Sequence, residues 1–303
     1  MRFLADYVMR GRMQAILVAA VMALLSLVLP LLTYLSGAAV GLVTLRVGPR
    51  QGLGVTAGAM LALAVLCGAI FGNPLPGIGF ALVLWVPVWI LAADLRRGVD
   101  LARSVKLAGL FGVMLVIGIY LATDNPVTWW QDVLQKVLSP ALEGAAKERI
   151  DEMTTAVAQI AKLMTGLMGG LMGLTLLGCL FIARWWQALL YNPGGFKSEF
   201  HQLRLGRRFA LATMAAGLLL MISSGETMPM ATDLLVVMVM LYMIQGLAVS
   251  HSLVANGGAN PGWLVLLYVM AVLLPQAALT LAVAGFTDNW FDFRTIFGKK
   301  PKQ

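Results

Sequence analysis

The residues that could perform catalysis or bind a metal are few in this sequence, and they do not cluster. Catalysis requires a nucleophile beside a base, paired carboxylates or a metal ion. Cys67 and Cys179 each lie in an apolar segment without a second cysteine nearby, and His201 and His251 are far apart in the chain. The sequence therefore predicts no catalytic residue, no metal site and no cofactor, and we expect a protein that is not an enzyme.

We place no charged residue deep inside an apolar segment and read Arg103, Lys106 and Arg184 as lying toward segment ends. Asp94, Glu226 and Asp233 each fall at the end of such a segment. Pumps and ion-coupled carriers usually hold an ionisable group within the membrane. This distribution argues against a proton-coupled or ion-coupled transporter.

Neutral hydrogen-bonding side chains are the polar groups that remain inside the apolar segments. Thr33, Tyr34 and Ser36 cluster just past Pro30, where a first helical hairpin is expected to turn on the outer side of the membrane. Two hydroxyls and a phenol ring could bind a small neutral solute there. Ordinary hydrogen bonding between helices is the alternative. These three residues are our candidate ligand-binding site.

The composition places these residues in a membrane. The chain of 303 residues is 60% hydrophobic and 12% charged, whereas soluble domains carry roughly 25% charged residues. We therefore expect an all-α integral membrane protein with the lipid bilayer as its main partner. The formal net charge of +8 does not indicate nucleic-acid binding, because the cations lie at the ends of apolar segments.

Nine apolar segments suggest a polytopic bundle of about 8–9 transmembrane helices, given that a span needs about 20 apolar residues. The segments are 13–29, 31–45, 52–71, 78–93, 101–122, 163–190, 209–223, 232–254 and 263–286, the last kinked at Pro275. The cations between them favour a cytoplasmic N-terminus. Nine spans then leave the basic C-terminal tail outside, so we expect one span, 78–93 or 209–223, to be re-entrant or merged with a neighbour.

Three regions follow from this division: an N-terminal transmembrane bundle (1–122), a pair of extra-cytoplasmic amphipathic helices (123–162) and a C-terminal transmembrane bundle (163–303). Apolar residues recur at alternating steps of four and three from Ala146 through Val157 to Leu171. This stripe predicts one long helix that continues the span of 163–190 outward. We expect the stripe to pack on the neighbouring outer helix; a homodimer through it is the alternative.

The segment 191–208, "YNPGGFKSEFHQLRLGRR", is expected to form a cytoplasmic elbow. Phe196 and Phe200 lie four apart on one face of a short amphipathic helix, which suits the membrane interface. His201 has no second ligand or base nearby in the sequence, so we expect it to be idle. The two phenylalanines are candidate residues for docking a partner, and a simple topological hinge is the alternative.

Three stretches together resemble one family. They are "LPLLTYLSGAAVGLVTLRVGPRQGLGVTAGAML", the elbow sequence above, and "QGLAVSHSLVANGG" followed by "WLVLLYVMAVLLPQ" and "GFTDNWFDFR". They are similar to the YybS-like family of uncharacterised polytopic bacterial membrane proteins, and this resemblance implies a location in the bacterial inner membrane. That family is distantly similar to the substrate-binding S components of energy-coupling-factor importers, which are shorter, six-span proteins.

The resemblance implies a function for the N-terminal half and a contact for its first helix. S components dock a coupling subunit through small residues four apart, and Ala15, Ala19 and Ala23 match this spacing here. We therefore expect a non-enzymatic protein with an S-component-like N-terminal half that binds or transports a small neutral solute and contacts a membrane protein partner through its first helix. The alternative is a structural or assembly factor. The outer helical pair and the further spans depart from the S-component pattern.

Overall fold

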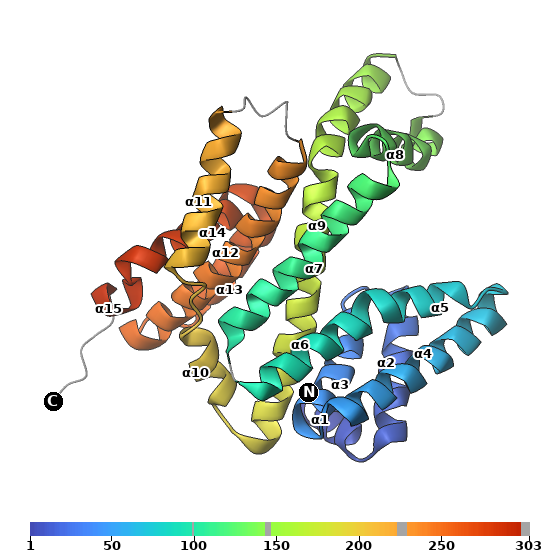
Figure 1. The fold of residues 1–303 in the computed structure, drawn as a ribbon, viewed down its shortest axis with the longest axis vertical. Helices are drawn as coiled ribbons and strands as arrows, with labels where there is room; N and C mark the ends of the chain where they lie inside the picture. Colours follow the sequence, from blue (N-terminus) through green and yellow to red (C-terminus); the bar gives the residue numbers. More distant parts are fainter. Residues whose placement is uncertain (99, 143–146, 223–228, 298–303) are drawn as a thin grey trace.

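The computed structural model describes residues 1–98, 100–142, 147–222 and 229–297, and every regular element in these ranges is a helix (Figure 1). The α-helices are α1 (Arg2–Met9), α2 (Arg12–Leu25), α3 (Leu32–Arg46), α4 (Pro49–Phe71), α5 (Leu75–Phe80), α6 (Val86–Arg97), α7 (Leu101–Ala122), α8 (Pro126–Leu142), α9 (Lys147–Tyr191), α10 (Gly195–His201), α11 (Arg207–Ile222), α12 (Pro229–Gly257), α13 (Gly262–Leu273), α14 (Pro275–Phe291) and α15 (Phe293–Phe297). A single π-helical turn, Ala81–Trp85, joins α5 to α6.

The longest helix, α9, is the axis of the molecule. Its 45 residues correspond to about 67 Å at the rise of an α-helix. Figure 1 shows α9 running from the end where α8 packs on it to the end where the α10 elbow lies. Helices α1 to α6 lie on one side of α7 and α9, and α11 to α15 lie on the other. The predicted long helix is thus confirmed. It continues without a break through residue 162, where the sequence analysis placed the boundary between the outer helices and the C-terminal bundle.

The core of the N-terminal bundle is α3, whose residues from Ser36 to Leu45 are all buried. Helices α2, α4, α6 and α9 surround it. Small residues allow this close approach: a Cβ atom added at Gly41 would lie 2.8 Å from the Cβ of Ala183 on α9. The many glycines and alanines of this region therefore act as packing residues between helices.

Fewer helices than predicted are long enough to cross a membrane. Five described helices pass on length and composition: α4, the run Leu75–Arg97, α7, Glu152–Tyr191 within α9, and α12. The pair α13 and α14 makes a sixth if it is counted as one span, although it is bent by 117°. The structure therefore supports five or six candidate spans, and the predicted count of eight to nine is not confirmed.

The difference from the predicted count comes from three helices. Helices α2 and α3 have 14 and 15 residues, below the ~17 that a bilayer requires. Helix α11 has 16 residues up to Ile222, where the described range ends. The predicted segment 78–93 is part of a 23-residue candidate span. That either 78–93 or 209–223 is re-entrant or merged with a neighbour stays a prediction. A sharp bend lies at Leu274–Pro275, because proline removes a helix hydrogen bond and disfavours a helical residue before it; the predicted kink is confirmed.

The predicted heptad stripe describes the outer part of α9 only in part. Val157 is buried, but Ile160 and Leu171 are 49% and 51% exposed. The buried seam instead runs through Val157, Ala161 and Thr165, at steps of four. Thr165 accepts a hydrogen bond from Nε1 of Trp130 on α8 (2.9 Å), so small and hydroxyl residues form the contact between the two helices. Of the stripe, Ala146 and the side chain of Ile150 lie outside the described residues.

Candidate functional site

Ser36, the most buried of the predicted solute-binding residues, has both hydrogen-bonding partners inside the bundle. Its hydroxyl donates to the carbonyl oxygen of Ala19 on α2 (2.7 Å) and accepts from Nε1 of Trp85 (2.9 Å). Both side chains are fully buried. The hydroxyl therefore satisfies an indole N–H that would otherwise lack a partner, as expected of ordinary hydrogen bonding between helices.

Thr33 and Tyr34 face a different neighbour. Both are partly buried. The Tyr34 ring lies against α9, where a Cβ atom added at Gly178 would be 2.6 Å from its Cε1 atom. The thiol of Cys179 is 3.8 Å from the carbonyl oxygen of Thr33. The structure thus holds the three predicted residues at the start of α3 but turns Ser36 toward α2 and Tyr34 toward α9.

The alanines predicted to dock a partner are buried within this chain. Ala15, Ala19 and Ala23 on α2 are at most 3% exposed, and α2 packs on α3 and α4. The absence of larger side chains lets these helices approach α2 closely. A helix of another protein would have to displace them before it could reach this face.

The elbow helix α10 packs its apolar face on α9. The ring of Phe181 on α9 lies 5.7 Å from that of Phe196 and 5.6 Å from that of Phe200. Arg184 on α9 forms a bidentate ion pair with Glu199 on α10, with Nε 2.9 Å from one carboxylate oxygen. Such a pair is directional and largely shielded from water here. Aromatic packing and a charge pair together fix the elbow to α9.

His201 lies beside the other histidine of the chain, which its sequence context did not suggest. The rings of His201 and His251 are 6.4 Å apart, and Nε2 of His251 is 2.9 Å from the hydroxyl oxygen of Tyr268. Burial, and after it the positive charge of Lys197, lower the pKa of His201. A neutral imidazole is therefore favoured at this position. Among the described residues no group of three or more potential ligands could hold a metal ion.

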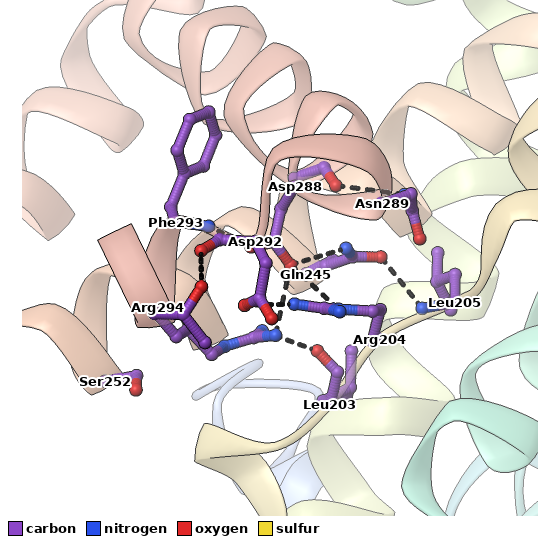
Figure 2. Close-up of polar contacts among 12 residues, drawn as sticks. Leu203, Arg204, Leu205, Gln245, Ser252, Asp288, Asn289, Asp292, Phe293 and Arg294 are labelled. Carbon is purple, nitrogen blue, oxygen red and sulfur yellow. Dashed lines mark hydrogen bonds and ion pairs between the residues drawn. The ribbon is translucent and has the colours of Figure 1, made fainter. Parts of the chain in front are cut away.

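A buried network of charged groups connects the elbow to the end of α14 (Figure 2). Asp288 is fully buried. One of its carboxylate oxygens lies 3.1 Å from Nη1 of Arg294 and 3.5 Å from Nε of Arg204. Arg204 also pairs with Asp292, and Arg294 donates to the carbonyl oxygen of Leu203 (2.7 Å). Two arginines and two carboxylates thus neutralise one another where the elbow meets the last helices.

Two amide side chains complete this network. Gln245 on α12 donates to Asp288 (3.1 Å) and accepts from the backbone N–H of Leu205 (2.9 Å). Asn289 accepts from the backbone N–H of Gly206 (2.8 Å). The extended chain after α10 has no helical partners for these N–H groups, so the amides satisfy them. The elbow is therefore a fixed joint between α9 and the C-terminal helices.

A second buried carboxylate, Asp233, lies in the first turns of α12. It is buried and accepts hydrogen bonds from the hydroxyl of Tyr120 on α7 and the backbone N–H of Gly166 on α9, both at 2.8 Å. Asp233 and Asp288 both lie near the end of a helix, as the sequence places them, but both are buried. The sequence did not predict this burial, because Tyr120, Gly166 and Arg204, which contact these carboxylates, are distant in sequence.

The helical architecture with several apolar candidate spans defines a multi-pass membrane protein. The chain belongs to the family described as "predicted membrane protein (DUF2232)", whose model matches residues 17–289. No curated protein and no solved structure matches the chain. The description of this family states a membrane protein and gives no function.

Proposed function

We propose that this protein is a non-enzymatic, multi-pass protein of the bacterial inner membrane whose N-terminal bundle binds a small neutral solute in the manner of the S components. The proposal rests on one observation. Six helical segments before the elbow, α2, α3, α4, α5–α6, α7 and α9, all contribute to the hydrophobic core, which α1 and the helices after the elbow extend. The resemblance to S components implies six helices, and this number supports the proposal although α2 and α3 are shorter than a full span. The α10 elbow and the helices after it are then an addition to that bundle.

The solute contacts in this proposal are Thr33 and Tyr34. The hydroxyl of Ser36 already donates one hydrogen bond and accepts another within the bundle. The side chains of Thr33 and Tyr34, in contrast, are only partly buried. Both lie at the beginning of α3, beside the turn that contains Pro30. A hydroxyl and an aromatic ring at such a turn can orient a small neutral molecule.

The topology proposed with this function places the N-terminus, the elbow and the C-terminus in the cytoplasm. The bent pair α13–α14 supports it, because both arms approach the elbow region: Tyr268 on α13 contacts His251, and the end of α14 contacts Arg204. A re-entrant pair reverses the chain without crossing the membrane and so leaves the basic tail on the cytoplasmic side. Single cysteines at Ser198 and Thr295 should then be labelled by an impermeant thiol reagent only after the membrane is opened.

The function is tested by native mass spectrometry of the intact protein, purified in mild detergent. We expect a small-molecule adduct on the wild type that is reduced in a Thr33→Ala/Tyr34→Phe variant. Thr280→Ala is the matched control, because this exposed hydroxyl on α14 bonds only to the carbonyl oxygen of Gln276 on its own helix. An adduct of equal occupancy in all three proteins would contradict a solute site at Thr33 and Tyr34.

A partner-docking function is the second candidate, and one observation favours it. Ile160 and Leu163 on the outer part of α9 are about half exposed although α8 covers the opposite side. A second copy of the chain could cover this surface. Cysteine at position 160 should then form a disulfide-linked dimer in membranes treated with an oxidant, whereas cysteine at the polar position Gln159 should not.

A further inference from the structure

A cavity lined by three arginines lies where the ends of α3, α6 and α9 meet. Its volume is about 290 Å³, and its lining residues are Leu45, Arg46, Leu95, Arg96, Arg184 and Gln187. This volume is close to the lower end of the usual range for ligand pockets, about 300 Å³. Neither the solute site nor the charged network around Asp288 includes any of these residues.

Each guanidinium group is held in place by contacts within the chain. Arg96 donates from Nη1 to the carbonyl oxygen of Leu45 (2.6 Å). Arg46 stacks on the ring of Tyr191, with its Cζ atom 4.0 Å from the ring centre. Arg184 is buried and donates from Nη1 to Gln187 (2.9 Å), in addition to its pair with Glu199. The three side chains therefore do not need to be ordered by a ligand.

The cavity carries excess positive charge. Glu199 is the carboxylate that faces its lining from α10, and it already pairs with Arg184. Asp94, the acidic residue of α6, is engaged by Arg103 at 2.7 Å. Arg46 and Arg96 show no ion pair within the described part of the chain. Three cations against one carboxylate leave an uncompensated charge of about two units.

We propose that this cavity binds a phosphate group. Guanidinium groups donate paired, coplanar hydrogen bonds that match phosphate oxygens, which is why arginine rather than lysine serves at such sites. The cavity also lies at the elbow end of α9, on the side that the charge distribution predicts to be cytoplasmic. Basic pockets between membrane helices on that side bind the headgroups of anionic lipids. The phosphate could equally belong to a soluble ion, and the experiment separates these two sources.

The test measures the thermal unfolding midpoint of the full-length protein in detergent. One arm adds phosphatidylglycerol, with phosphatidylcholine of the same acyl chains as its control. The other adds inorganic phosphate, with chloride at the same ionic strength. We expect stabilisation by phosphatidylglycerol alone if the site takes a lipid headgroup, and stabilisation by phosphate as well if it takes the soluble ion. No stabilisation of the wild type in either arm would overturn the proposal.

The variants assign the effect to this cavity. Arg46→Gln should weaken the apparent affinity by roughly tenfold to a hundredfold, the effect of losing a charged hydrogen bond. Arg46→Lys should recover part of the loss. Arg97→Gln is the matched control, because this exposed arginine follows Arg96 on α6 and does not line the cavity. Equal affinities of the wild type and Arg46→Gln, with Arg46→Gln as stable as wild type in the absence of ligand, would contradict the proposal.

Discussion

In the N-terminal bundle the deepest polar contact is neutral: the hydroxyl of Ser36 connects Trp85 to α2. In the C-terminal half the corresponding contact is charged: the carboxylate of Asp288 lies between Arg204 and Arg294. Burying a hydroxyl that keeps its hydrogen bonds costs little, whereas burying an ion requires a partner charge and further hydrogen bonds.

The difference predicts how each half responds to mutation. The N-terminal bundle depends on the shape of small side chains, so a substitution there is expected to act through packing volume. The C-terminal half depends on mutual neutralisation, so the removal of one charge exposes the remaining ones to an apolar surrounding. The following predictions test this contrast in order of expected effect.

Replacing Asp288 by asparagine should have the largest effect. The substitution keeps the shape of the side chain but leaves Arg204 and Arg294 without their shared carboxylate, at an expected cost of about 3–5 kcal/mol. The measurement is the thermal unfolding of the purified protein in detergent. Asp124→Asn, at an exposed position, should change stability very little. A similar, small loss in both variants would show that the charge of Asp288 is not needed.

Ala19→Leu should have the next largest effect, because it adds volume to the neutral half. Ala19 is fully buried between α2 and its neighbours, and overpacking of this kind costs about 1–3 kcal/mol. Val21→Leu adds volume on the exposed side of the same helix and should be tolerated. If both variants unfold at the wild-type temperature, the alanine face is not tightly packed.

Ser36→Ala should cost about 1–2 kcal/mol, because it removes the hydrogen bond that satisfies the indole N–H of Trp85. Ser26→Ala serves as the control, since that hydroxyl bonds only to the carbonyl oxygen of Ala23 on its own helix. The loss in Ser36→Ala should be insensitive to salt. A salt-dependent loss would contradict the assignment of a neutral contact.

The sequence predicted the neutral half better than the charged half, and the reason is physical. Small residues at helical spacing show that another helix approaches closely, but not which helix: Ala15, Ala19 and Ala23 were expected to dock a partner, and they pack within this chain. Asp288 and Arg204 are separated by more than eighty residues, and no local pattern shows that they meet. No local pattern shows that His201 and His251 meet either. The length of α2 was also overestimated, because hydropathy does not reveal where a helix stops short of crossing the bilayer.

The smallest predicted effect concerns pH. The pKa of His201 is lowered from its ordinary value of 6.5 by burial and by neighbouring positive charge. Protonation is therefore less favourable in the folded state, so the stability is complete above that value and falls as the pH drops through it. Thermal unfolding between pH 7.5 and pH 5.5 should show a small loss for the wild type and a smaller one for His201→Gln. An unchanged or steeper loss in the variant would place the titrating group elsewhere.

Hydrogen exchange of the wild type and Asp288→Asn, followed by mass spectrometry, tests most directly whether the two halves are stabilised independently. Local unfolding frees backbone amides for exchange only in the region that has lost its support. We predict faster exchange in the elbow and in α12 to α15, with α2 to α6 unchanged. Faster exchange of similar size throughout both halves would contradict this account.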